Sequence, residues 1–271
     1  MPKIKTTIIK SLKGYISHTE SLVRKHDNPF WFRGCGEASQ ELKPSLFRHK
    51  KSTKIASFMD LEKHLISRFS QRSIPFHSRS FGDDWDRLFF MQHYGVPTRL
   101  LDWSESPLMA LFFAVTSSAY TFNHLGKPVF KNDAAIWILD PNRWNKKAFQ
   151  LKSYDGEILS TDNTNVNAYK PKSEIATMKD FPIAILGAHN SQRIVSQRGV
   201  FVCFGKDIRP METIYKEVGF PSGSLTKLII KKEDLPHMHS ALKRHGITDS
   251  VAFPDLDGLA REIKREFSFE V

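Results

Sequence analysis

Residues 85–114 read WDRLFFMQHYGVPTRLLDWSESPLMALFFA and decide the fold. Apolar residues recur at helical spacing at the start of this segment, and we expect that helix to end at Tyr94 because Gly95 and Pro97 follow. A short strand is predicted next, over Thr98 to Leu101. Between its apolar ends the segment carries His93, Thr98, Arg99, Asp102 and Trp103.

A second helix is predicted at the end of this segment. Ser106 can cap it, Pro107 takes the favoured first position, and the helix runs through Ala114. Helical spacing predicts three more helices: one at the N-terminus through Ile8, Leu12, Tyr15, Ile16 and Leu22, one over Phe58 to Phe69, and one over Leu259 to Phe267 capped by Asp257.

Four short apolar or β-branched runs flanked by breakers are strand candidates: Phe30 to Phe32, Ala134 to Leu139, Val200 to Phe204 and Leu225 to Ile230. Helices cluster early and late, whereas strands concentrate in the middle and second half. We therefore predict an α+β fold, a single mixed domain with a central, mainly antiparallel or split β-sheet flanked by helices.

Composition narrows the class of protein. The longest apolar stretch, Leu108 to Val115, is far shorter than the roughly 20 residues that cross a bilayer, so no membrane partner is expected. Cys35 and Cys203 lie far apart and outside any zinc-like spacing, which favours a cytoplasmic protein without a metal. The net charge of +11 attracts polyanions, either nucleic acid or a phosphorylated small molecule. A surface that merely happens to be basic explains the charge equally well.

Arg33 and Gly34 stand out in residues 30–36, which read FWFRGCG. An aromatic strand would deliver the arginine directly before a glycine turn. The planar guanidinium matches phosphate bidentately, and glycine lets a ligand approach the backbone closely. We interpret the pair as a phosphate anchor. The alternative is that Arg33 ties down a core carboxylate such as Asp102.

His93 would lie at the C-terminal end of the first helix, where the helix dipole favours the imidazolium. It is a candidate for a phosphate or a ribose hydroxyl, and a capping role explains it as well. Arg99 and Asp102 need fixed partners if their strand is central, because an isolated buried charge costs several kcal/mol. Structural ion pairing accounts for these two residues as well as catalysis does.

Gln197 belongs to a third polar cluster, residues 191–201, which read SQRIVSQRGVF and precede a predicted strand. A carboxamide there can orient a hydroxyl or a water, but it cannot act as a general base at neutral pH. The motifs GxxxxGK[ST], HExxH and GxSxG are missing from the sequence. We expect no metal cofactor.

These segments together resemble the FRG family, named for a Phe-Arg-Gly motif that is Phe32-Arg33-Gly34 here. The resemblance predicts one FRG domain over residues 1–271, with an N-terminal helical part at about 1–29 and a core at 30–271. Ser104 and Ser196 depart from the Thr and Ala of the pattern. The other matching stretches are LKPSL at 42–46 followed by Arg48, QHYGVPTRLLDW at 92–103, AAIWIL at 134–139, QRGVF at 197–201 and FPDLDGLA at 253–260.

A more distant similarity is to ADP-ribosyltransferases. An arginine on an early strand followed by glycine resembles their first motif, and a strand followed by an Ala-Leu-Phe-Phe-Ala helix resembles their second. Their third motif supplies a glutamate on a late strand. Gln197 is the positional equivalent here, and Glu37 and Asp102 are the carboxylates available to replace that glutamate.

The resemblance implies a pocket that binds NAD or a related nucleotide, with ADP-ribosyltransferase-like or NAD-cleaving activity in phage defence or a toxin system. Arg33 would hold the diphosphate, His93 the ribose, and Asp102 or Gln197 would orient the reacting centre. The other residues expected to bind the cofactor or order its pocket are Gly34, Tyr94, Thr98 and Arg99. The alternative is a non-enzymatic module that binds nucleic acid or a protein through its basic surface.

Overall fold

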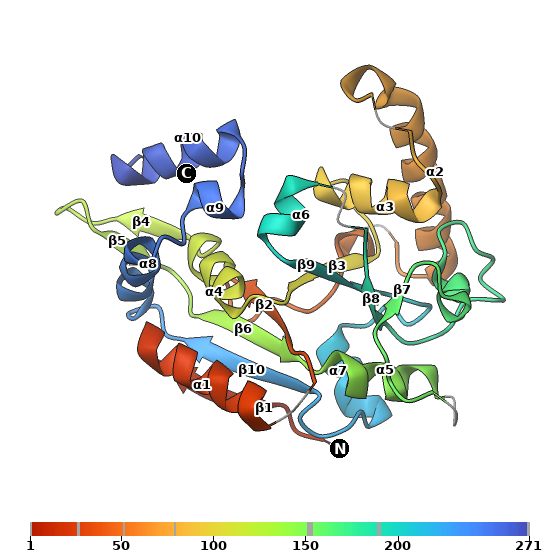
Figure 1. Ribbon diagram of the computed structural model, residues 1–271, viewed down its shortest axis with the longest axis horizontal. Helices are drawn as coiled ribbons and strands as arrows, with labels where there is room; N and C mark the ends of the chain where they lie inside the picture. Colours follow the sequence, from red (N-terminus) through yellow and green to blue (C-terminus); the bar gives the residue numbers. More distant parts are fainter. Residues whose placement is uncertain are drawn as a thin grey trace.

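The computed structural model describes residues 2–25, 28–50, 52–78, 80–150, 154–188 and 191–269 (Figure 1). Most strands join one sheet: β1 (Lys5–Ile9), β2 (Trp31–Cys35), β3 (Leu100–Ser104), β6 (Ala134–Leu139), β7 (Leu159–Ser160), β8 (Ile183–Leu186), β9 (Gly199–Cys203) and β10 (Leu225–Ile230). Their order is β1-β10-β6-β2-β3-β9-β8-β7, and only the two edge pairs of this sheet are parallel. A hairpin of β4 (Tyr120–Phe122) and β5 (Pro128–Phe130) stands apart. The predicted mixed α+β domain with a large, mainly antiparallel sheet is confirmed.

Helices flank the sheet along its whole width (Figure 1). The α-helices are α1 (Leu12–Lys25), α2 (Ile55–Arg72), α3 (Asp84–His93), α4 (Pro107–Thr116), α5 (Pro141–Phe149), α6 (Gln192–Ser196), α7 (Met211–Val218), α8 (Leu235–Arg244), α9 (Asp249–Ala252) and α10 (Leu256–Glu266). Short 3-10 helices lie at η1 (Ser45–Arg48), η2 (Ile74–Phe76) and η3 (Thr164–Tyr169). Among the described residues, no helix has the length and apolarity needed to cross a bilayer.

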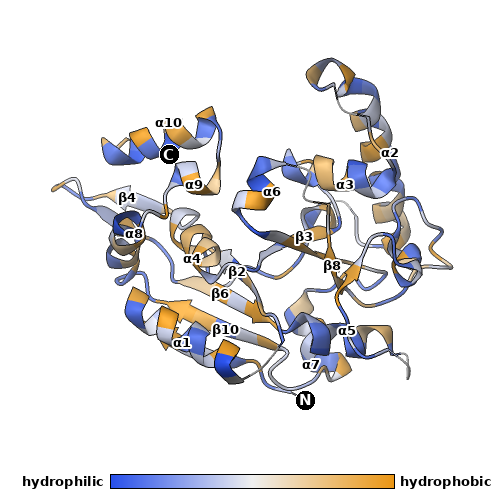
Figure 2. Ribbon diagram, in the orientation of Figure 1, coloured by the Kyte–Doolittle hydropathy of each residue, from blue (hydrophilic) through white to orange (hydrophobic). Residues whose placement is uncertain are grey.

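Strand β6 separates two hydrophobic cores. All of its residues are buried, and their alternation sends Ile136 and Ile138 into one cluster and Trp137 and Leu139 into the other. The first cluster also contains side chains of α1, α4 and α8, and the second contains side chains of α3, α5 and α7. Figure 2 shows the apolar colour concentrated on β6 and β10 between helices of mixed colour.

The sheet opens between β2 and β3. Strand β2 pairs with β6 along its whole length, and β3 does so with β9. The β2–β3 ladder, in contrast, consists of the single pair Phe32↔Ser104. The two strands therefore diverge beyond this pair, and their next residues, Arg33 and Trp103, no longer face each other across a continuous ladder. This divergence makes room for the site described below.

The helix that covers β2 follows the sequence closely. Ser106 caps α4 by accepting from the Met109 amide, and Pro107 opens the helix, as predicted. Gly34 on β2 permits this packing, because a Cβ there would overlap the Ala110 carbonyl and the Ala114 amide of α4. The glycine of the FRG motif is thus needed for the close approach of a helix, whereas the sequence suggested the close approach of a ligand.

Other sequence-based assignments were wrong in detail. Ile8 belongs to β1, where it pairs in parallel with Ile229. The N-terminal segment forms the edge strand of the sheet beside β10, and α1 begins only at Leu12. Asp255, not Asp257, caps α10 by accepting from the Gly258 amide at 2.7 Å. Strands are also frequent in the first half of the chain, where β1, β2 and β3 all lie.

Candidate functional site

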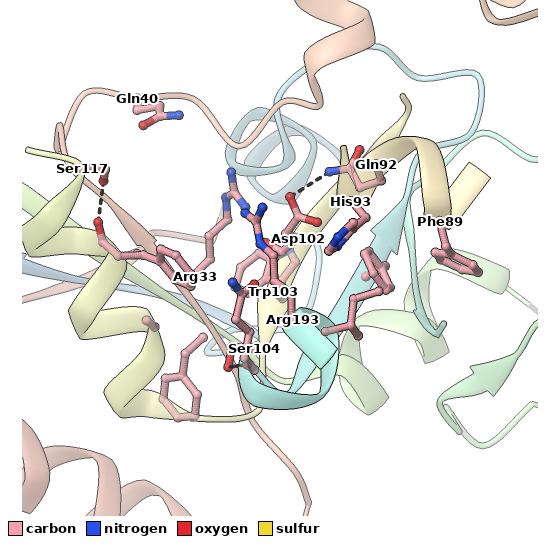
Figure 3. A pocket seen from close by; sticks show the side chains of 17 residues that line it. Arg33, Gln40, Phe89, Gln92, His93, Asp102, Trp103, Ser104, Ser117 and Arg193 are labelled. Atoms are coloured by element: carbon pink, nitrogen blue, oxygen red, sulfur yellow. Dashed lines mark hydrogen bonds between the residues drawn. The ribbon is translucent and has the colours of Figure 1, made fainter. Parts of the chain in front are cut away.

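A cavity of about 320 Å³ lies where β2 and β3 diverge. Helices α3, α4 and α6 and strand β9 complete its walls (Figure 3). The apolar part of the lining consists of Phe32, Gly34, Phe89, Trp103, Ala110, Phe113, Ile194 and Phe201. The polar part consists of Arg33, Gln40, Gln92, His93, Asp102, Ser104, Ser117, Arg193 and Gln197. Five residues predicted from three distant segments therefore meet in one cavity: Arg33, Gly34, His93, Asp102 and Gln197.

Arg33 reaches across the gap between the two strands. Its Nη1 donates to the backbone carbonyl of Asp102 at 2.5 Å, where the β2–β3 ladder has ended. Of the two interpretations that the sequence allowed, ion pairing with the Asp102 carboxylate is therefore not what the structure contains. The rest of the half-exposed guanidinium faces the cavity, where its fork of donors suits an anion (Figure 3).

The Asp102 carboxylate is exposed to the cavity and is held by a neutral partner. Its Oδ2 accepts from Gln92 Nε2 at 2.8 Å. Gln92 Oε1 in turn accepts from the Thr98 hydroxyl. Gln92 was not among the residues predicted from the sequence, because a glutamine on an amphipathic helix is usually only a solvated side chain. The signal that could have found it is its place inside the QHYGVPTRLLDW stretch.

Arg193 is the second cation of the cavity, and sequence reasoning missed it too. Its guanidinium lies over the Phe253 ring, 4.5 Å from the ring centroid, and Arg261 lies at the same distance from that ring. Burial lowers the pKa of Arg193, and the charge of Asp102 opposes this shift. The only signal in the sequence was its place in the polar cluster that contains Gln197.

His93 lines the cavity beside Arg193, and its Nδ1 forms a hydrogen bond with the Ser191 hydroxyl at 3.2 Å. Burial lowers the pKa of His93, and the positive charge of Arg193 adds to that effect. Both effects oppose the imidazolium that the helix dipole was expected to favour. In its neutral form, the ring can accept a hydrogen bond from a ligand hydroxyl or donate one to it.

Gln197 joins the cavity wall to the C-terminal segment. Its side-chain Nε2 donates to the Ala252 carbonyl at 2.9 Å, and its backbone carbonyl accepts from the Ser104 hydroxyl at 2.6 Å. These bonds hold the end of α6 against β3 and α9. Because the Gln197 amide already donates within the protein, Asp102 is the better placed of the two residues proposed for the reacting centre.

Four residues singled out from the sequence lie outside the lining of the cavity. Arg99 is completely buried and forms an ion pair of 3.0 Å with Glu62. This contact favours structural ion pairing over a catalytic role for Arg99. Thr98 is also buried and contacts the cavity only through Gln92. Tyr94 is 63% exposed and packs against the His93 ring. Glu37 is exposed, accepts from the Ser39 hydroxyl and does not line the cavity.

The cavity combines two guanidinium groups, one carboxylate and several aromatic rings. Such a set can hold an anionic group together with a flat ring, and the carboxylate can take a proton or stabilise a developing positive charge. Within the part of the chain that the structure describes, no three His, Cys, Asp or Glu side chains gather to hold a metal ion.

Comparison with known proteins gives one match. Residues 28–121 match the model of the FRG domain, a range that contains Arg33, His93, Asp102 and helix α4. Arg193 and Gln197, which also line the cavity, lie outside this range. No curated protein and no solved structure matches the chain. The extension of the domain to residues 1–271 stays a prediction, and the match itself shows that the chain carries an FRG domain in residues 28–121.

Proposed function

We propose that the cavity binds NAD or a related nucleotide and that the protein is an ADP-ribosyltransferase-like or NAD-cleaving enzyme. One observation carries this proposal: Arg33 and Arg193, from distant segments, line the same cavity as the Asp102 carboxylate, within aromatic walls (Figure 3). A nucleotide presents the matching groups, since it joins anionic phosphates to flat rings through a ribose.

Different groups of lining residues suit different parts of such a ligand. The guanidinium groups of Arg33 and Arg193 would bind phosphate oxygens, because their planar forks match that geometry. The rings of Phe89 and Phe201, whose centroids lie 4.8 Å apart, form an apolar wall near His93. The volume of about 320 Å³ lies at the lower end of the usual range for small-molecule sites, roughly 300 Å³ and above, and fits one nucleotide-sized group.

Asp102 would perform the chemical step. In NAD cleavage, a water attacks the ribose carbon, the nicotinamide leaves with the electron pair of the glycosidic bond, and one proton is released from the water. A carboxylate beside the ribose can accept that proton and stabilise the positive charge that develops on the sugar. The Asp102 carboxylate faces the cavity and accepts from a neutral amide, so it remains available for this role.

The test is the release of nicotinamide from NAD by the purified protein, followed by chromatography. We expect Asp102→Asn to lower the rate at least about a hundredfold, the usual minimum for the loss of a general base. Asp60→Asn is the matched control, because Asp60 is exposed on α2 away from the cavity. Equal rates for the wild type and Asp102→Asn would refute the enzymatic proposal.

The proposed setting is a cytoplasmic effector in phage defence or a toxin system, which rests on the family resemblance alone. Expression of the wild type in a bacterial host should deplete NAD or slow growth, and Asp102→Asn should abolish that effect. If both proteins depleted NAD equally, Asp102 would not be the reacting residue. If neither did so during growth or phage infection, the proposed setting would be wrong.

A further inference from the structure

Gln92 connects α3 with β3 through an amide whose orientation is determined by its partners. Its Oε1 accepts from the Thr98 hydroxyl, and its Nε2 donates to Asp102 Oδ2 at 2.8 Å. The Thr98 oxygen also accepts from the Leu100 amide at 3.1 Å, so its single hydrogen is left for Gln92. The amide cannot be turned over without placing its nitrogen against the Thr98 hydroxyl and its oxygen against a carboxylate.

The hydrogen bonds from Thr98 to Gln92 and from Gln92 to Asp102 form a relay, and its Thr98 end is anchored in the core. Thr98 has no exposed surface. Its backbone amide donates to the Ser45 hydroxyl at 3.3 Å, and its carbonyl accepts from the Leu46 amide at 3.1 Å. A rigid support of this kind is what holds a site residue in a productive geometry.

The carboxylate at the other end of the relay has two arginines close by but is paired with neither. Arg33 donates to the backbone carbonyl of Asp102, and Arg193 interacts with the carboxylate through its charge. Within the described residues, no ion pair of 4.0 Å or less joins Asp102 to Arg33 or Arg193. The bond from Gln92 directs the carboxylate toward α3 instead (Figure 3).

We propose that Gln92 is a positioning residue, which Thr98 orients and which holds the Asp102 carboxylate away from the two guanidinium groups. A carboxylate released from Gln92 would form an ion pair with Arg33 or Arg193 and compete with an anionic ligand for their donors. The inference rests on the proposed nucleotide site and adds how that site stays open to anions.

The orientation of the amide is tested without any ligand, by NMR on the free protein. We expect the side-chain amide protons of Gln92 to exchange with water at least about tenfold more slowly than those of Gln71, which is exposed on α2. Thr98→Val should remove this protection, and Thr98→Ser, which keeps the hydroxyl, should restore it. Exchange of Gln92 as fast as that of Gln71 in the wild type would overturn the relay.

The effect on binding is tested by calorimetry with NAD and with inorganic pyrophosphate. Gln92→Met should weaken both affinities about tenfold or more, whereas the matched control Gln71→Met should leave them unchanged. Adding Asp102→Ala to Gln92→Met should restore pyrophosphate binding, because the competing carboxylate is then gone. A damaged fold would not be rescued in this way, so failure of the rescue would refute the positioning role.

The two tests separate this inference from the proposed function. A wild-type protein that binds neither NAD nor pyrophosphate would refute the nucleotide site and, with it, the role of Gln92 in keeping that site open. Slow exchange of Gln92 that Thr98 controls would then still establish the relay itself. Binding of NAD by the wild type together with unchanged affinity in Gln92→Met would leave the proposed function standing and reject the inference.

Discussion

Arg99→Met should strongly destabilise the protein, but the folded fraction should keep its ability to bind the proposed ligand in the cavity. The Arg99 and Glu62 side chains are only 1% and 2% exposed, and their charged groups lie 3.0 Å apart. Arg99 Nη2 also donates to the carbonyls of Tyr169 and Lys170 at 2.7 and 2.9 Å. Removing one partner of a buried ion pair costs about 3–5 kcal/mol, and the carbonyls left without a donor add to that cost.

Urea unfolding measures this loss directly. Since domains are stable by roughly 5–15 kcal/mol, the variant should retain only a part of the wild-type free energy of unfolding. Glu62→Gln in the same background should recover some of the loss, because it removes the buried charge left unpaired. A loss below about 1 kcal/mol in Arg99→Met would refute the assignment of Arg99 to the core. Retained NAD binding in the folded fraction would separate Arg99 from the cavity.

Three further predictions concern packing, pH and salt. Gly34→Ala should lower the free energy of unfolding by about 1–3 kcal/mol in a urea titration, because its Cβ would overlap backbone atoms of α4 that cannot move aside; an unchanged midpoint would contradict this packing. Burial, with Arg265 and Lys243 nearby, lowers the pKa of His239 to about 4, so the unfolded chain binds a proton there at higher pH than the folded protein does. Stability should therefore fall by up to about 3 kcal/mol between pH 6.5 and 4, and thermal unfolding should show a smaller fall in His239→Gln. The net charge of +11 predicts salt-sensitive binding to duplex DNA that Arg33→Gln leaves unchanged in fluorescence anisotropy; loss of that binding in Arg33→Gln would favour a nucleic-acid site in the cavity.

The sequence predicted best where local chemistry determines structure. The strands at 134–139 and 225–230 have the predicted bounds because each is a short apolar run between breakers. The Ser106 cap and Pro107 likewise define the start of α4 without help from distant residues. The N-terminal segment was misassigned, because whether Ile8 continues a helix or pairs with β10 depends on a strand more than two hundred residues away.

The site was predictable only in part. The residue types of Arg33, His93 and Asp102 identified them as candidates, and the structure brings them into one cavity. The lowered pKa of His93 results from burial and from the charge of Arg193, and no local sequence pattern reveals either cause. Gln92 is recognisable only from the pair of hydrogen bonds that fixes its amide, since neither partner is its neighbour in sequence.

The central claim is that the cavity between β2 and β3 binds a nucleotide, and calorimetric titration of the purified protein with NAD tests it most directly. We predict saturable binding that Arg33→Gln and Arg193→Gln each weaken by at least about tenfold, since each removes a charge-assisted contact worth ~1.5–3 kcal/mol. Arg24→Gln is the control, because this α1 side chain is 81% exposed and does not line the cavity. Binding that neither cavity variant weakens, or no binding by the wild type, would contradict the claim.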